Sequence, residues 1–137
     1  MKIAVLGYGT VGSGVVEVLD VNQKLIATRA KEEIEVKYVL DLRNFPGDKI
    51  QEKIVHDYEI ILNDPEIGIV VEVMGGVEPA NTFVRKALEA GKSVVTSNKA
   101  LVAKHGSALL KTAREKNVNF LFKASVGGGI PILRALG

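Results

Sequence analysis

The N-terminal segment constrains the fold more than any other part of the chain. Residues 2–6 form a mainly apolar run that leads directly into Gly7, Gly9 and Gly12, and residues 13–19 continue with a helical pattern. In such a strand, turn and helix, the first glycine permits a tight turn, the second lets the backbone approach a pyrophosphate, and the third lets the helix pack on the strand. The free N–H groups at the helix start favour phosphate oxygens. The G-x-G-x-x-G spacing therefore predicts a dinucleotide-binding unit, with an ordinary tight turn as the alternative.

Composition narrows the remaining possibilities. The chain has 137 residues, 47% hydrophobic and 25% charged, which suits one globular domain with its own core. Its 18 basic and 16 acidic residues leave a net charge of +2 without a long basic run, so we expect no nucleic acid and no anionic membrane as a partner. No apolar stretch approaches the ~20 residues of a membrane span, so we expect a cytoplasmic protein. The absence of cysteine excludes disulfides, thiolate catalysis and cysteine-bound metals.

Strand-like and helix-like segments alternate along the rest of the chain. Residues 67–74 form a mainly β-branched run, which is typical of a strand buried on both faces at the centre of a parallel sheet. One helix is expected after Pro79. Another is expected from a cap at Ser97 or Asn98 to its end at Asn117. The other predicted strands are residues 35–41, 93–96 and 119–122. This order predicts an α/β fold with a doubly wound parallel sheet, in a single domain.

Ligands of an open parallel sheet bind beyond the carboxyl ends of its strands, where several unusual residues gather. Asp41 is suited to accept hydrogen bonds from an adenosine ribose, which selects NAD. Arg43 is suited to pair with a 2′-phosphate, which admits NADP. Both interpretations stay open, as does the alternative that these are turn residues. Gly75 and Gly76 would let the backbone pass close to a nicotinamide, although a turn that ends a strand also explains a glycine pair.

Lys99 is the candidate for reactivity. A cation at the start of a helix is disfavoured by the helix dipole, so a lysine after Thr96-Ser97-Asn98 is better explained if it reaches toward a substrate or cofactor. A solvent-facing lysine is the alternative. We expect His56 and His105 to be surface or packing residues, because neither has metal-ligating partners at a suitable spacing.

Three further segments carry a resemblance to a known family. Residues 71–80, 94–101 and 124–132 read VEVMGGVEPA, VVTSNKAL and ASVGGGIPI. Together with the N-terminal glycine motif, they resemble homoserine dehydrogenase over essentially the whole chain. The resemblance implies a Rossmann fold and reversible hydride transfer between L-homoserine and L-aspartate 4-semialdehyde, with NAD or NADP, in threonine and methionine biosynthesis. Another NAD(P)-dependent amino-acid oxidoreductase and a non-catalytic nucleotide-sensing module are the alternatives.

The resemblance also implies a domain organisation. Enzymes of this family are more than twice as long as this chain. We therefore expect residues 1–137 to be the NAD(P)-binding domain, with about 123–137 leading into a substrate and dimerisation region that the chain lacks. Such a chain would bind the cofactor without turnover, and the full-length enzyme would be a homodimer.

Carried over position by position, the resemblance assigns roles to single residues. Lys99 is the catalytic candidate, and would orient the substrate oxygen, stabilise alkoxide charge or relay a proton. The family's sodium site implies backbone carbonyl ligands at Lys123, Val126, Gly128 and Ile130, with a simple glycine-rich turn as the alternative. Leu40 stands where the family commonly has arginine, so NAD and NADP both stay open. The predicted cofactor-binding residues are Gly7, Tyr8, Gly9, Thr10, Val11, Gly12, Asp41, Arg43, Gly75, Gly76, Thr96, Ser97 and Lys99.

Overall fold

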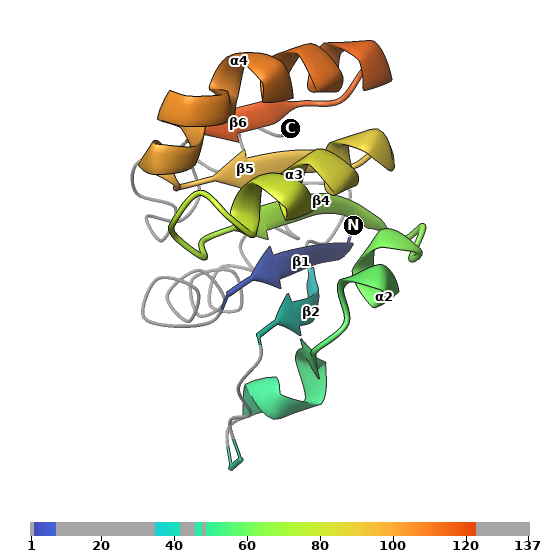
Figure 1. Ribbon diagram of the computed structural model, residues 1–137. Helices are drawn as coiled ribbons and strands as arrows, with labels where there is room; N and C mark the ends of the chain where they lie inside the picture. The colour runs from blue at the N-terminus through green and yellow to red at the C-terminus, as the bar shows by residue number, and fades with distance from the viewer. Residues whose placement is uncertain (1, 8–34, 42–45, 48, 123–137) are drawn as a thin grey trace, which may run out of the picture.

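The computed structural model describes residues 2–7, 35–41, 46–47 and 49–122, which form a parallel sheet with helices packed against it (Figure 1). The six strands lie in the order β3-β2-β1-β4-β5-β6. Their bounds are β1 Lys2–Leu6, β2 Glu35–Leu40, β3 Ile54–Val55, β4 Ile67–Glu72, β5 Ser93–Thr96 and β6 Phe120–Phe122. The helical segments are η1 Lys49–Lys53, α2 Tyr58–Leu62, α3 Ala80–Glu89 and α4 Lys99–Lys116. The predicted doubly wound parallel sheet is confirmed, with the strand order of dinucleotide-binding folds.

Strand β4 lies near the centre of the sheet, as its mainly β-branched sequence predicts. It pairs with β1 on one side and with β5 on the other, so that Val71 lies between Val5 and Val95. All three valines are buried. The strand ends at Glu72, two residues before the predicted end, because the chain turns there into the glycine pair.

The sheet has a hydrophobic core on each face, because successive side chains of a strand point to opposite sides. Figure 1 shows α3 and α4 side by side over the half of the sheet that contains β4, β5 and β6. The core beneath these helices includes Ala4, Leu6, Val70, Val84, Leu88, Val94, Leu101 and Leu109. The core on the opposite face comprises Ile3, Val5, Val36, Val39, Ile50, Ile69, Val71 and Val95.

The ends of α4 follow from local side-chain chemistry. The Oδ1 of Asn98 accepts a hydrogen bond from the N–H of Leu101 at 3.1 Å, so Asn98 rather than Ser97 caps the helix. At the other end, Asn117 adopts the left-handed conformation with φ 57° and ψ 43°, which stops the helix. The predicted end at Asn117 is confirmed.

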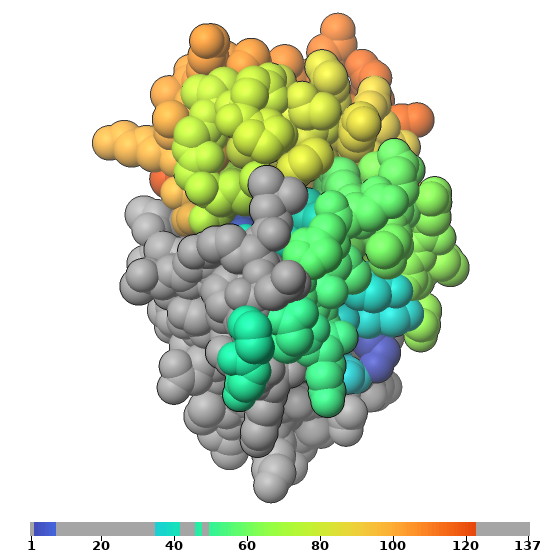
Figure 2. All heavy atoms as spheres, turned by 60° about the horizontal axis from the view of Figure 1, so that its bottom comes forward, coloured from blue at the N-terminus to red at the C-terminus, as the bar shows by residue number. Residues whose placement is uncertain are grey.

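The segment between β2 and β4 contains elements that the sequence patterns did not predict. Strand β3 has only two residues and adds to the sheet through pairing of Val39 with Ile54. Helix α2 has five residues and begins where the Asp57 carboxylate accepts from the N–H of Glu59 at 3.0 Å. Tyr58 of α2 then packs on Phe83 of α3 with ring centroids 4.5 Å apart. Figure 2 accordingly shows the green segment around α2 lying against the yellow-green α3.

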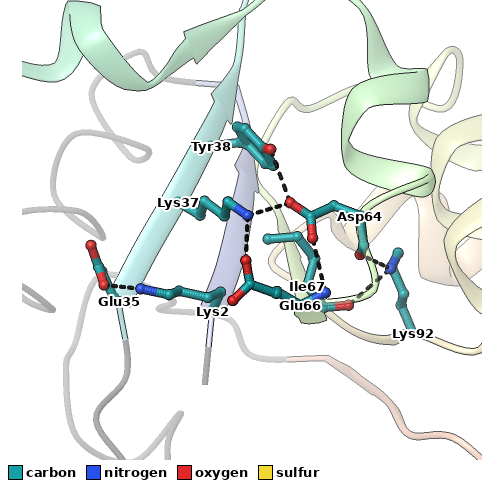
Figure 3. Close-up of polar contacts among 8 residues, drawn as sticks. All are labelled: Lys2, Glu35, Lys37, Tyr38, Asp64, Glu66, Ile67 and Lys92. Atoms are coloured by element: carbon teal, nitrogen blue, oxygen red, sulfur yellow. Dashed lines mark hydrogen bonds and ion pairs between the residues drawn. The ribbon is translucent and has the colours of Figure 1, made fainter.

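A polar network links β2 to the amino ends of β4 and β5 (Figure 3). The Asp64 carboxylate accepts from the Lys37 ammonium at 2.5 Å and from the Tyr38 hydroxyl at 2.9 Å. The buried ammonium of Lys92 donates to the carbonyls of Asp64 at 2.8 Å and Ile67 at 2.9 Å. Side chains from β2 and from the residue before β5 thus hold the turn that leads into β4.

Two predictions fall on residues that the structure does not describe. The helix predicted at residues 13–19 lies outside the described residues, as does the segment 123–137 expected to lead into another region. Among the helices of the described part, none is long and apolar enough to cross a membrane.

Candidate functional site

The strand order places the candidate site at the carboxyl ends of β1, β4 and β5. From β1 the chain proceeds outward through β2 to β3, whereas β4 starts again beside β1 and proceeds outward through β5 to β6. Ligands of such sheets bind where this order reverses, beyond the carboxyl ends of the strands. Leu6, Glu72 and Thr96 lie side by side in one row at this end of the sheet. The loops that follow these three residues carry most of the predicted site.

Gly7 makes the turn that leaves β1. Its φ of +94° is in the region that favours glycine, and its N–H donates to the Leu40 carbonyl at 2.8 Å. A Cβ at this position would lie 3.2 Å from the Met74 Cγ and 3.3 Å from the Met74 Cα. The loop after β4 therefore approaches the turn after β1 so closely that a side chain at residue 7 would collide with it.

The loop after β4 exposes its backbone. The N–H of Val73 still donates to the Leu6 carbonyl at 3.1 Å, and the chain then passes through Gly75 at φ +78° and Gly76 at φ +75°. Both glycines are exposed, and consecutive left-handed residues strongly favour glycine. This open backbone fits the close approach of a flat ring that the glycine pair predicts.

Glu72 is a site residue that the sequence analysis did not select. Its side chain is fully buried. One carboxylate oxygen accepts from the N–H of Met74 at 2.7 Å, and the other accepts from the hydroxyl of Thr96 at 2.6 Å. The available signal was a single acidic residue inside a buried β-branched run.

Asn98 joins the loop after β4 to the start of α4. Its side-chain N–H donates to the Gly76 carbonyl, and its backbone N–H donates to the Thr96 hydroxyl oxygen at 3.0 Å. Asn98 itself is buried, whereas the next residue, Lys99, is exposed as the first residue of α4. The cap therefore fixes the backbone from which Lys99 extends.

The predicted residues Thr96 and Ser97 differ in accessibility. Thr96 has no exposed surface, and its hydroxyl both donates to Glu72 and accepts from Asn98. Ser97 is half-buried, and its N–H donates to the Glu72 carbonyl at 3.2 Å. The Thr96 side chain is thus engaged inside the protein, so any ligand would meet this segment through its backbone, Ser97 or Lys99.

The end of β2 brings Asp41 next to a histidine. The N–H of Asp41 donates to the Val55 carbonyl at 3.2 Å. The Nδ1 of His56 lies 2.7 Å from the Asp41 carbonyl and acts as a donor to it, since a carbonyl oxygen can only accept. His56 was expected to be a surface or packing residue. Its side chain is exposed, as expected, and it also lies beside a predicted ribose-binding residue, because the unpredicted β3 pairs with β2.

Other predicted site residues lie outside the described residues, namely Tyr8, Gly9, Thr10, Val11, Gly12, Arg43, Lys123, Val126, Gly128 and Ile130. Within the described part, no group of three or more histidine, cysteine, aspartate or glutamate side chains is placed to hold a metal ion. His105 is half-buried on α4.

Known proteins are similar to this chain in sequence and in fold. The sequence model of a family described as homoserine dehydrogenase, NAD binding domain, matches residues 7–123. Homoserine dehydrogenase of Pseudomonas aeruginosa is 44% identical over 137 residues, covering 99% of this chain and 32% of that protein. A crystal structure of S. aureus homoserine dehydrogenase matches with a TM-score of 0.83 and 40% identity, covering 91% of this chain and 32% of that one.

A further structural match was solved with a nucleotide. A hyperthermophilic archaeal homoserine dehydrogenase mutant in complex with NADPH has a TM-score of 0.65 and 25% identity, covering 90% of this chain and 44% of that one. The chain spans about a third of the length of the curated relatives it matches.

Proposed function

Because the chain belongs to the family of homoserine dehydrogenase NAD-binding domains, we propose that it binds NAD or NADP across the carboxyl ends of β1, β4 and β5. The observation that carries this proposal is the close approach of Met74 to the Gly7 turn where the strand order reverses, with the exposed pair Gly75-Gly76 directly after Met74. Backbone without side chains lets a pyrophosphate and a flat ring approach closely. The family membership also decides against the alternative of a different oxidoreductase family.

We assign the two halves of the cofactor to different loops. The pyrophosphate would lie on residues 7–12, which contain the glycine motif, and the nicotinamide would lie between Gly75-Gly76 and residues 96–99. Asp41 or Arg43 would contact the adenosine ribose, and which of them dominates would decide between NAD and NADP. Backbone carbonyls of Lys123, Val126, Gly128 and Ile130 are proposed to hold sodium.

For the whole protein, we propose the family reaction, in which L-homoserine and L-aspartate 4-semialdehyde are interconverted. The nicotinamide supplies the hydride acceptor for the carbon that bears the hydroxyl. Lys99 would place its ammonium at the reacting oxygen, where a cation stabilises developing alkoxide charge. Its position directly after Asn98, whose side chain bonds to the Gly76 carbonyl, places its backbone close to the glycine pair and supports this role. We further propose that the whole protein is a homodimer in threonine and methionine biosynthesis.

Calorimetric titration of the 137-residue chain with NADH and, separately, with NADPH tests the cofactor assignment. We expect binding of at least one nucleotide. A preference for NADH would assign selection to Asp41, and a preference for NADPH would assign it to Arg43. A folded chain that binds neither nucleotide would contradict the proposal.

The Gly9→Ala variant tests whether the pyrophosphate binds at the loop of residues 7–12. A methyl group there would occupy the space through which the phosphates approach the backbone, so affinity should fall by about tenfold or more while the chain stays folded. Unchanged NADH affinity in a folded Gly9→Ala variant would move the pyrophosphate away from this loop.

A further inference from the structure

We propose that Glu72 is a positioning residue, which holds the loop after β4 and the start of α4 in one arrangement and thereby sets the affinity for the nicotinamide half of the cofactor. This inference rests on the proposed cofactor site. It assigns a role to a buried acidic side chain that none of the predicted contacts uses.

The first step is the setting of the carboxylate. Glu72 has no exposed surface, yet both of its oxygens have donors, the Met74 N–H at 2.7 Å and the Thr96 hydroxyl at 2.6 Å. One side chain thus joins the loop after β4 to the last residue of β5.

The second step is that Asn98 links the same two segments through further hydrogen bonds. Asn98 donates through its side chain to the Gly76 carbonyl and through its backbone to the Thr96 hydroxyl oxygen. The loop after β4 is therefore held at Met74 by Glu72 and at Gly76 by Asn98. Thr96 connects the two holding groups, because its hydroxyl bonds to both.

The third step is the difference in exposure between the hydrogen-bonded residues and their neighbours. Glu72, Thr96 and Asn98 are buried, whereas Gly75, Gly76 and Lys99 are exposed beside them. The buried members fix the backbone, and the exposed members form the surface on which we propose that the nicotinamide lies. A shift of either loop would change the distance between the glycine pair and Lys99.

The fourth step is that the Met74 N–H and the Thr96 hydroxyl both donate to residue 72. Only a side chain that accepts at both of its ends can bond to both of them. Burying a polar group is unfavourable unless hydrogen bonds compensate it, so a fully buried glutamate side chain in a hydrophobic strand indicates a specific requirement. Glutamine has nearly the same shape but offers one acceptor oxygen and one donor group. In Glu72→Gln, the amide oxygen can still accept from the Met74 N–H, but the amide N–H₂ would donate to the Thr96 hydroxyl, so the proton of that buried hydroxyl would lose its acceptor.

The experiment compares two nucleotides on the 137-residue chain, NADH and ADP-ribose, which lacks the nicotinamide. Calorimetry should show that wild type binds NADH more tightly than ADP-ribose. In Glu72→Gln we expect the NADH affinity to fall about tenfold and the ADP-ribose affinity to change less than about twofold. A merely destabilising change would weaken both nucleotides alike.

Ile67→Val is the matched control, because it alters a buried side chain at the other end of the same strand. It should lower stability without changing the ratio of the two affinities. If Glu72→Gln does not fold, Thr96→Val removes one donor of the same carboxylate, and Thr96→Ser, which keeps the hydroxyl, should recover most of the NADH affinity that Thr96→Val loses.

The outcomes separate the two proposals. A wild-type chain that binds neither NADH nor NADPH contradicts the proposed cofactor site; if it binds NADPH alone, the same comparison is made between NADPH and 2′-phospho-ADP-ribose. Equal wild-type affinities for NADH and ADP-ribose, or parallel losses of both in Glu72→Gln, overturn the role of Glu72 while leaving the cofactor site intact. Equal NADH affinity in Thr96→Val and Thr96→Ser also overturns it.

Discussion

At the end of β1, a glycine allows the loop after β4 to approach the turn after β1 closely. Gly7 has a left-handed backbone conformation. In addition, a Cβ added at Gly7 would lie 3.3 Å from the Met74 Cα. The second feature adds to the first, because the Met74 backbone would have to shift to make room for a Cβ and its N–H is bonded to the Glu72 carboxylate. The glycine is therefore required by packing as well as by conformation.

Gly7→Ala should consequently cost more stability than an ordinary glycine substitution. The left-handed conformation costs about 1–2 kcal/mol for alanine, and the collision with Met74 adds to it, so we expect a total loss of about 2–4 kcal/mol. Urea unfolding followed by circular dichroism measures the change.

Gly91→Ala is the control, because Gly91 has a φ of +83° but nothing within 4 Å of its hypothetical Cβ. It should show only the conformational cost. Equal losses in the two variants would mean that the loop after β4 moves aside without penalty.

Among the elements, β2 is joined to the turn before β4 by charge as well as by packing. The Lys37 ammonium, the N–H of Glu66 and the Tyr38 hydroxyl all hydrogen bond to the Asp64 carboxylate and lower its pKa from 3.8 to about 2 (Figure 3). Lys37 also pairs with the Glu66 carboxylate at 2.7 Å, and these bonds raise the pKa of Lys37. The ionised form of Asp64 is thus favoured in the folded chain.

This pKa shift predicts an acid-sensitive step in stability. Between about pH 4 and pH 2 the unfolded chain binds a proton at residue 64 that the folded chain does not, so the free energy of unfolding should decrease as the pH falls through this window. Above the window the stabilising contribution is fully present. Chemical unfolding at a series of pH values should show this slope in wild type and a shallower slope in Asp64→Asn.

Two variants check the cause of the slope. Lys37→Met removes the principal partner of Asp64 and should also make the slope shallower. Glu89→Gln removes an exposed carboxylate from α3 and should leave the slope close to that of wild type. A wild-type slope in Asp64→Asn would show that other groups govern acid unfolding.

The sequence patterns predicted the longer elements better than the short ones. The β-branched residues of β4 and the caps of α4 are local signals, and the structure confirms a buried central strand and a helix that ends at Asn117. Strand β3 has two residues, too few for any periodicity, and exists because β2 offers it an edge. The position of His56 beside Asp41 depends on that pairing, and no spacing along the chain reveals it.

Across the whole molecule, different polar groups lie at the two ends of the sheet. The row at the carboxyl ends leads into the proposed cofactor loops, whereas the Asp64 network lies at the amino ends of β4 and β5. Substitutions in the network should therefore affect stability without reshaping the cofactor loops. The chain spans about a third of the length of its curated relatives, so tests of catalysis need the remaining portion of such a protein.

We expect the 137-residue chain to bind cofactor without oxidising L-homoserine. A chimera that joins it to the remaining two thirds or so of the P. aeruginosa relative should restore turnover. In that chimera Lys99→Ala should lower kcat/KM by about a hundredfold or more, with the Kd for NADH changed much less. Steady-state rates and calorimetry measure the two quantities.

Lys104→Ala, which alters an exposed lysine on the same helix, is the control for that experiment. It should keep the kcat/KM of the chimera. Unchanged turnover in Lys99→Ala would remove Lys99 from the mechanism.

By itself, the sequence determined the α/β fold class, the central strand, the C-terminal end of α4 and the family. These depend on hydrophobic periodicity, turn residues and caps, which act within a few positions of the chain. Only the tertiary structure decided that Glu72 meets Thr96, that Asn98 meets Gly76 and that a Cβ on Gly7 would collide with Met74. The physical reason is that these contacts depend on strand order and register, which bring together residues that lie more than twenty positions apart in the chain.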